Sequence, residues 1–435
     1  MKEVIVIFDI GKTNKKVLLF DKDLKVIHEQ EQKFEEIKDD DGFECDNIKL
    51  IESWIINTLR ELVNDAKYKI KAVNFTTYGA TLMHIDESGK ALTPLYNYLK
   101  PLSEDITNPF YKKYGGKEEF SRKTASPPLG FLNSGLQILW LKETKPEIFA
   151  EVDNILHFPQ YCSYILTGKS VSEYTSIGCH TAMWDFDEMK YHDWLAEEGI
   201  ELPEPISNSA SFESRIPEFI FPVGIGIHDS SASLAPYIME SEDKFVLLST
   251  GTWSINMNPF NYDPLTKEEL NKDCLSYMSI SQKPVKSSRL FMGHIHDVNL
   301  EKLVSYFEAN KDAFKKVKTD ESKIATMLKE ESKFFKNGMP GNYIDEEIDL
   351  SQFSSFDEAY HQLVCDITEL LKESIDLILP ENDDVKKIYI SGGFSKNEIF
   401  IKCLASLYNQ KTVYTSEIDN ATALGAAMVM YEHIG

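Results

Sequence analysis

Residues 4–20 have the sequence VIVIFDIGKTNKKVLLF, in which two strand-like runs flank a short polar turn. Runs of β-branched and aromatic residues on either side of a turn predict a β-hairpin. Asp9 ends the first run, where a carboxylate can hold Mg²⁺, and Gly11 lets the turn approach a phosphate closely. On its own, the segment fits a plain hairpin with an exposed aspartate as well as it fits a phosphate-binding turn.

The composition of the whole chain restricts the classes of protein to which it can belong. The 435 residues suffice for two domains, and 42% apolar with 27% charged residues is typical of a globular chain. A net charge of −24 repels nucleic acid and anionic lipid, so we expect neither as a partner. No apolar run is long enough for a membrane helix, and the N-terminus does not resemble a signal peptide. Six scattered cysteines without a CxxC pair indicate reduced thiols in a cytoplasmic protein.

The apolar periodicity predicts strands and helices along both halves of the chain. The expected strands cover residues 4–9, 17–20, 26–37, 71–79, 82–86, 91–98, 219–227, 245–259, 386–390 and 412–418. The expected helices cover residues 47–66, 132–149, 153–166, 299–308, 320–333, 356–379, 397–408 and 419–434. Each half opens with a strand, a turn rich in threonine and glycine, and another strand. This weak internal symmetry predicts two domains, 1–237 and 238–435.

Two more turns repeat the chemistry of the first one. Residues 248–254, LSTGTWS, place hydroxyls around Gly251 between two strands, which suits a second phosphate clamp or an ordinary serine-rich hairpin. Gly392 and Gly393 follow a strand directly and precede a helix, so a nucleotide could lie over this turn with its phosphates at the helix N-terminus. Alone, that turn is also typical of a plain strand-to-helix connection. The sequence contains neither a P-loop nor a full GxGxxG motif.

A fourth segment, His228-Asp229-Ser230-Ser231, lies between a glycine-rich strand and small helix-forming residues. Asp229 could accept the proton of a substrate hydroxyl or hold a metal ion. It could equally be only the N-cap of the following helix.

These segments, in this order, resemble the FGGY family of carbohydrate kinases in the actin-like ATPase superfamily. DIGKTN is similar to the family's first phosphate motif, LSTGTWS to its second, and ISGGFSKNEIFIKCLASLYNQKTVYTSEIDNATALGAA to its adenosine motif. GIGIHDSSASL resembles the segment that carries the catalytic aspartate. The resemblance covers nearly the whole chain, and HDSSAS is nearer to the L-rhamnulose and L-fuculose kinases than to the glycerol or xylulose kinases.

The resemblance implies an α/β fold of two actin-like (ribonuclease H-like) domains, with mixed sheets flanked by helices and a cleft between the domains. It implies that ATP phosphorylates a primary hydroxyl of a small sugar, such as L-rhamnulose or L-fuculose, with Asp229 as general base and Mg²⁺ near Asp9 and Asp229. The residues expected at ATP are Gly11, Lys12, Thr13, Asn14, Thr250, Gly251, Thr252, Gly392, Gly393, Asn397 and Gly425. Those expected at the sugar are Thr77, Tyr78, Gly79, Tyr174 and His228.

Two departures from the family pattern leave the substrate open. Lys12 stands where the family usually has threonine, and Tyr96-Asn97-Tyr98 stands where Trp-Asn-Asp is frequent. Xylulose, ribulose or glycerol are therefore alternative acceptors. Two other classes also remain: an actin-like ATPase switch, which a large client-binding domain would favour, and a sugar sensor without catalysis, which the presence of Asp229 argues against. We expect a monomer or a homodimer.

Overall fold

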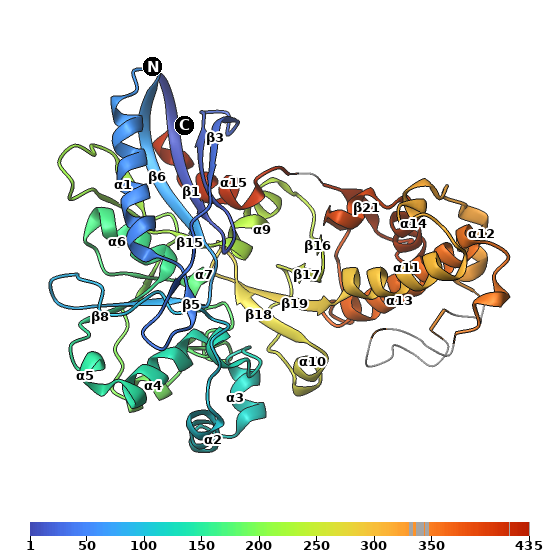
Figure 1. Ribbon diagram of the computed structural model, residues 1–435, viewed down its shortest axis with the longest axis horizontal. Coiled ribbons are helices and arrows are strands. Elements are labelled where there is room, and N and C mark those ends of the chain that lie inside the picture. The colour runs from blue at the N-terminus through green and yellow to red at the C-terminus, as the bar shows by residue number, and fades with distance from the viewer. Residues whose placement is uncertain (330–333, 336–342, 344–347, 417, 435) are drawn as a thin grey trace.

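The computed structural model describes residues 1–329, 334–335, 343, 348–416 and 418–434, which form two lobes (Figure 1). The N-terminal half of the chain builds one lobe, and most of the C-terminal half builds the other. Each lobe contains a sheet of mixed strand direction with helices beside it. The expected α/β architecture with two domains is confirmed.

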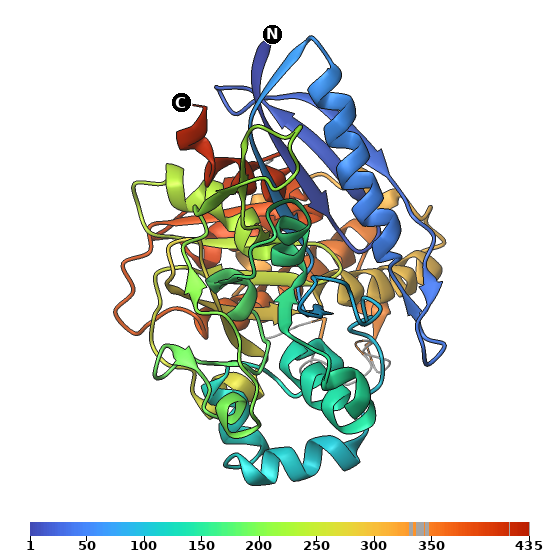
Figure 2. The same cartoon turned by 90° about the vertical axis from the view of Figure 1, so that its left-hand side faces the viewer.

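The first sheet has the strand order β13-β14-β6-β1-β2-β3, and β15 also pairs with β6. β1 pairs antiparallel with β2 and parallel with β6, so Asp9 lies opposite Lys16 on one side and Thr76 on the other. Residues 4–8 are fully buried, which explains their unbroken apolar character. Helix α1 (Ile48–Asn64), the blue helix in Figure 2, covers one face. The strands are Lys2–Ile10 (β1), Lys15–Phe20 (β2), Val26–Gln32 (β3), Tyr68–Thr77 (β6), Ser211–Glu213 (β13), Pro222–Gly224 (β14) and Ile227–His228 (β15).

The second sheet repeats this arrangement in the order β18-β19-β17-β16-β20-β21. β16 pairs antiparallel with β17 and parallel with β20, so Thr250 lies opposite both Ser254 and Gly392. β16 and β17 thus correspond to β1 and β2, and the weak symmetry of the sequence becomes a shared topology. The strands are Phe245–Thr250 (β16), Ser254–Asn258 (β17), Cys274–Met278 (β18), Pro284–Leu290 (β19), Lys387–Gly392 (β20) and Thr412–Thr415 (β21).

The remaining elements connect and flank the two sheets. The other strands are Ile37–Lys38 (β4), Glu44–Cys45 (β5), Leu82–Ile85 (β7), Asn154–His157 (β8), Ser172–Glu173 (β9), Trp184–Asp185 (β10), Lys190–Tyr191 (β11) and Pro205–Ile206 (β12). The other α-helices are Glu104–Lys113 (α2), Lys117–Lys123 (α3), Ser134–Thr144 (α4), Pro146–Phe149 (α5), Phe158–Thr167 (α6), Tyr174–Ile177 (α7), Trp194–Glu197 (α8), Asp229–Glu240 (α9), Lys267–Asn271 (α10), Met292–Tyr306 (α11), Glu321–Met327 (α12), Phe356–Asp376 (α13), Glu398–Leu407 (α14) and Ala421–Met428 (α15).

Several predicted elements differ from the structure; the strand predicted over 26–37, for example, ends at Gln32. The helix predicted over 153–166 begins as strand β8, which pairs with β7, and turns helical only at Phe158, where Pro159 occupies the first turn. The strand predicted over 91–98 is wrong, because Ala91 and Leu95 form only isolated bridges. Helix α12 ends at Met327, and residues 330–333 of the helix predicted there lie outside the described residues.

The last helix crosses from the second half of the chain to the first sheet. α15 packs on α9 so closely that a Cβ on Gly425 would lie 1.9 Å from the carbonyl oxygen of Ala232. The side-chain amide of Asn74, on β6, donates a hydrogen bond of 3.0 Å to the carbonyl oxygen of Ala426. Figure 1 shows α15 beside β1 accordingly. The boundary between 1–237 and 238–435 stays a prediction, although residues 421–434 lie on the first lobe.

The sequence also predicts reduced cysteines and no membrane helix. All six cysteines are buried free thiols. Within the described part of the chain, no helix combines the length and apolar character needed to cross a membrane.

Candidate active site

Two hairpin turns, each with a backbone hydrogen bond donated by its glycine, stand at corresponding places in the lobes. In the turn between β1 and β2, the Gly11 N–H donates to the Asn14 carbonyl oxygen at 2.9 Å. In the turn between β16 and β17, the Gly251 N–H donates to the Trp253 carbonyl oxygen, also at 2.9 Å. Thr13 and Thr252 are exposed in these turns. Each turn thus presents hydroxyls and backbone amides, which suit phosphate oxygens.

Two carboxylates, those of Asp9 and Asp229, lie near enough to each other for their charges to interact. Asp9 is the penultimate residue of β1, and Asp229 is the first residue of α9. Burial and the nearby charge of Asp229 raise the pKa of Asp9 to about 7, and Lys16 opposes this rise only in part. A divalent cation would offset the repulsion between the carboxylates, so the pair fits the Mg²⁺ that accompanies ATP. Asp9 and Asp229 would hold the ion, and its charge would help to neutralise the phosphates.

The carboxylate of Asp229 is oriented by its neighbours. Its Oδ1 accepts a hydrogen bond from the Ser230 N–H at 2.6 Å and lies 3.3 Å from Nε2 of His228. Burial lowers the pKa of His228, although the charge of Asp229 opposes this shift, so a neutral imidazole is favoured. The side chain of Asp229 is 34% exposed, and no hydrogen bond to its Oδ2 occurs among the described residues. Oδ2 is therefore the oxygen left without a protein hydrogen bond that a substrate hydroxyl could use.

The loop that follows β6 packs directly on His228. A Cβ on Gly79 would lie 2.5 Å from Nε2 of His228, so only glycine fits there. Thr77 pairs with His228 across β6 and β15. Three of the five residues expected at the sugar, Thr77, Gly79 and His228, therefore lie together beside Asp229. Tyr174 starts α7 and packs edge-on against Trp184, with ring centroids 5.7 Å apart. Its contact with a sugar stays a prediction.

Tyr78 and Lys12 share a partner that the sequence did not reveal. The Tyr78 hydroxyl donates to Asp46 at 2.7 Å, and the Lys12 ammonium pairs with Asp46 at 2.8 Å and with Glu36 at 2.6 Å. Asp46 lies between β5 and the Asn47 cap of α1 and belongs to no motif, so nothing in the sequence marked it. The Lys12 charge is thus engaged by carboxylates, and its expected contact with phosphate stays a prediction.

A cavity of about 430 Å³ opens between α9, the second sheet and the start of α15. Gly392 and Gly393 line one side of it, with Ser391 and Ser395. Gly392 has φ of +83°, and a Cβ there would lie 1.9 Å from the Thr250 carbonyl oxygen. Gly393 has open space where its Cβ would be. The cavity is also lined by residues that were not among those expected at ATP: Ser233, Tyr237, Ser416 and Ile418.

Three residues expected at ATP hold this region together. The Thr250 hydroxyl donates to the Ser391 carbonyl oxygen at 2.5 Å and accepts from the Phe394 N–H at 3.1 Å, so it ties β16 to the glycine turn. Asn397 caps α14, and its amide donates to the Tyr360 hydroxyl at 3.0 Å. Gly425 forms the close crossing of α15 with α9 and is not among the residues that line the cavity. Direct contacts of these side chains with ATP stay predictions.

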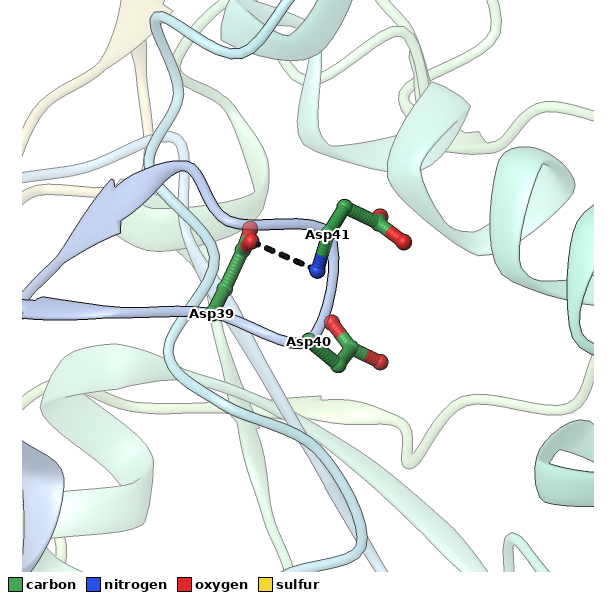
Figure 3. A group of neighbouring side chains, drawn as sticks. All are labelled: Asp39, Asp40 and Asp41. Carbon is green, nitrogen blue, oxygen red and sulfur yellow. Dashed lines mark hydrogen bonds between the residues drawn. The ribbon is translucent and has the colours of Figure 1, made fainter.

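A group of three aspartates lies apart from this region, in the turn between β4 and β5 (Figure 3). Lys100 pairs with Asp39 and Asp41, and Lys145 pairs with Asp40 and Asp41, all at 2.5–2.9 Å. The two ammonium groups already occupy the positions that a cation would take. The cluster is therefore a structural ion network that anchors the turn to α4.

The family follows from comparison with known proteins. The model for the N-terminal domain of the FGGY family of carbohydrate kinases matches residues 4–205, and the model for the FGGY C-terminal domain matches residues 242–434. The chain belongs to the FGGY family of carbohydrate kinases. This FGGY kinase is therefore a sugar kinase, and the transferred phosphoryl group comes from ATP.

Curated relatives of this FGGY kinase include rhamnulokinases at low identity. The rhamnulokinase of Halalkalibacterium halodurans is 22% identical over 458 residues, which cover 98% of this chain and 91% of the relative. The rhamnulokinase of Mannheimia succiniciproducens is 24% identical over 257 residues, and this alignment spans 57% of this chain and only 52% of the relative.

Solved structures show the same fold. A carbohydrate kinase from Novosphingobium aromaticivorans is 22% identical, with a TM-score of 0.83, over 100% of this chain and 92% of that one. A ligand-bound xylulose kinase from Lactobacillus acidophilus is 16% identical, with a TM-score of 0.77, over 99% of this chain and 89% of that one. At these identities the likeness supports the fold alone, and it confirms the expected two-domain FGGY architecture.

Proposed function

We propose that this FGGY kinase transfers the γ-phosphoryl group of ATP to a primary hydroxyl of a small ketose, with L-rhamnulose as the first candidate. The observation that carries the proposal is the position of Asp229. Its carboxylate lies 3.3 Å from the His228 ring, which packs on Gly79, and its charge acts on Asp9 beside the first turn. A general base needs this place, because it must reach the attacking hydroxyl next to the phosphate.

In this proposal Asp229 takes the proton of the sugar hydroxyl as the oxygen attacks the γ-phosphorus. The neutral His228 ring lies beside Oδ1, which already accepts the Ser230 N–H, and Oδ2 is left for the hydroxyl. General-base assistance contributes about 10²–10⁴-fold, and positioning and charge stabilisation supply much of the rest.

The two turns and the cavity would bind different parts of ATP. The turns at Gly11 and Gly251 would bind the β- and γ-phosphates through backbone amides and the hydroxyls of Thr13 and Thr252. The adenosine would occupy the cavity above Gly393. Approach of the two lobes around the substrates would exclude water, which otherwise competes as phosphoryl acceptor.

The substrate class rests on sequence similarity. Two curated relatives that match nearly the full chain are rhamnulokinases, and the HDSSAS segment resembles the deoxyketose kinases. Xylulose and glycerol kinases share the fold at lower identity and supply the alternative acceptors.

An acceptor screen with ATP-coupled detection tests the proposal. The purified protein should phosphorylate one ketose, L-rhamnulose first, with a kcat/KM at least about ten-fold above xylulose, ribulose and glycerol. Asp229→Asn should lower kcat by about 10²-fold or more while MgATP still binds in a calorimetric titration. ATP hydrolysis without any acceptor would favour an ATPase switch, and sugar binding without turnover would favour a sensor.

A further inference from the structure

One buried polar cluster joins four side chains from distant segments: Lys12, Lys15, Asp46 and Tyr78. We call it the Asp46 cluster. It lies at the loop that follows β6 and contains Tyr78 and Gly79, which we call the acceptor loop. Asp46 is 3% exposed and Lys15 is 1% exposed. Asp46 Oδ1 pairs with the Lys15 ammonium at 2.8 Å, and Oδ2 accepts from the Lys12 ammonium at 2.8 Å and the Tyr78 hydroxyl at 2.7 Å. Charge-assisted hydrogen bonds of this length are strong and directional when buried.

The Asp46 cluster joins the first phosphate turn to the acceptor loop. Lys12 belongs to the turn, and the Lys15 ammonium also donates to the Lys12 carbonyl oxygen at 2.9 Å. Tyr78 directly precedes Gly79, which packs on His228. A displacement of Asp46 would therefore move both the turn that faces the phosphates and the loop that faces the sugar.

Tyr98 packs against the Asp46 cluster. Its ring makes a T-shaped contact with Tyr78, with centroids 6.1 Å apart. Burial raises the pKa of Tyr98, and the charges of Lys12 and Asp229 shift it in opposite directions. Tyr98 replaces the aspartate that is frequent in the Trp-Asn-Asp pattern of the family.

We propose that Lys12 acts on the acceptor side of the site, where the Asp46 cluster positions the Tyr78–Gly79 loop against the sugar, and that Lys12 does not bind phosphate. This inference rests on the proposed sugar kinase activity. Lys12 and Tyr78 are positioning residues, because they act through the loop and through Asp46.

The charges of the Asp46 cluster also affect whether a neutral or an anionic acceptor binds. The two ammonium groups of Lys12 and Lys15 are matched by the carboxylates of Asp46 and Glu36. Asp229 adds a further negative charge on this side. The acceptor subsite therefore offers no unmatched positive charge from these residues, and it favours a neutral sugar over a sugar acid.

Steady-state kinetics of Lys12→Met and Tyr78→Phe test this inference. We expect both variants to raise the KM for the sugar roughly ten-fold, because each removes a hydrogen bond to a charged partner. The dissociation constant for MgATP should stay within about two-fold of wild type. The wild type should also prefer L-rhamnulose to gluconate.

Lys145→Met is the matched control for Lys12→Met. Lys145 also bridges two carboxylates, at 2.6 and 2.9 Å, and is 16% exposed, compared with 23% for Lys12. It lies in the Asp39–Asp41 network, so its loss should leave the sugar KM unchanged. Thermal unfolding of all three variants separates a local effect from a loss of fold.

Failure of this inference and failure of the proposed function would give different results. If Lys12→Met weakens MgATP binding and leaves the sugar KM unchanged, Lys12 is a phosphate ligand and the inference is wrong. If Lys145→Met raises the sugar KM equally, the effect is general destabilisation, which also overturns it. A preference of the wild type for gluconate would refute the charge argument. A wild type that phosphorylates no sugar would instead refute the proposed function.

Discussion

Gly392 provides a stringent test of how β16 and β20 fit together beside the cavity between α9 and the second sheet. At φ of +83° and ψ of −159°, its backbone occupies a region that only glycine adopts readily, at a cost of about 1–3 kcal/mol for another residue. A Cβ at this position would also lie 1.9 Å from the carbonyl oxygen and 2.9 Å from the carbonyl carbon of Thr250. Thr250 cannot yield cheaply, because its backbone is paired in β16 and its hydroxyl holds the glycine turn.

We therefore expect Gly392→Ala to lower the free energy of unfolding by about 3 kcal/mol or more. At roughly 2–4 °C per kcal/mol for domains of this size, Tm should fall by about 6 °C or more. Calorimetric unfolding of the protein without nucleotide measures this change, and a titration with MgATP measures the accompanying loss of affinity.

Gly393→Ala is the neighbouring control. A Cβ on Gly393 meets no atom within 4 Å, so Tm should stay within about 1 °C of wild type. MgATP affinity should still fall, because the methyl group enters the cavity. Equal losses of Tm in the two variants would refute the steric reasoning, and unchanged MgATP affinity in Gly393→Ala would remove the nucleotide from this turn.

Three further predictions follow from buried groups. Burial raises the pKa of Glu173 from its usual 4.5 to about 7, so the wild type should lose about 3 kcal/mol of stability as pH rises from about 4.5 through 7, and Glu173→Gln should lack this loss in urea unfolding across that range. Because a proton on Asp9 (pKa about 7) competes with a cation, MgATP should bind more tightly at about pH 8 than at about pH 6, and a calorimetric titration of Asp9→Asn should show no such gain. Gly425→Ala should destabilise the protein by about 2 kcal/mol or more in denaturant unfolding, because its methyl group would overlap the Ala232 carbonyl oxygen, and an unchanged midpoint would contradict the close helix crossing.

The parts of the fold that were predictable from sequence are those with local causes. The hairpin around Gly11 and the turn at Gly392 are determined by runs of β-branched residues and by glycines within a few positions. The place of Asp229 at the start of α9 follows in the same way from the small residues after it.

The missed features depend on partners far away in the sequence. Strand β8 lies inside a helix-like apolar run, and only its pairing with β7, about seventy residues earlier, makes it a strand. Asp46 gains its importance from Lys12 and Tyr78, each more than thirty residues away. No local pattern encodes such contacts, so neither the strand nor the shared carboxylate could be deduced from neighbouring residues.

The position of α15 on the first sheet has a consequence for biosynthesis. Ala423, Ala426 and Ala427 complete the apolar layer that contains Ile5 and Ile7. During translation, the first lobe cannot close this layer until the last helix has left the ribosome, although the rest of its sheet was made long before. Ribosome-bound chains stalled before residue 421 should therefore leave β1 and β6 open to protease, and protection equal to that of the released protein would contradict this order. Helix α15 thus determines when the N-terminal strands reach their native packing.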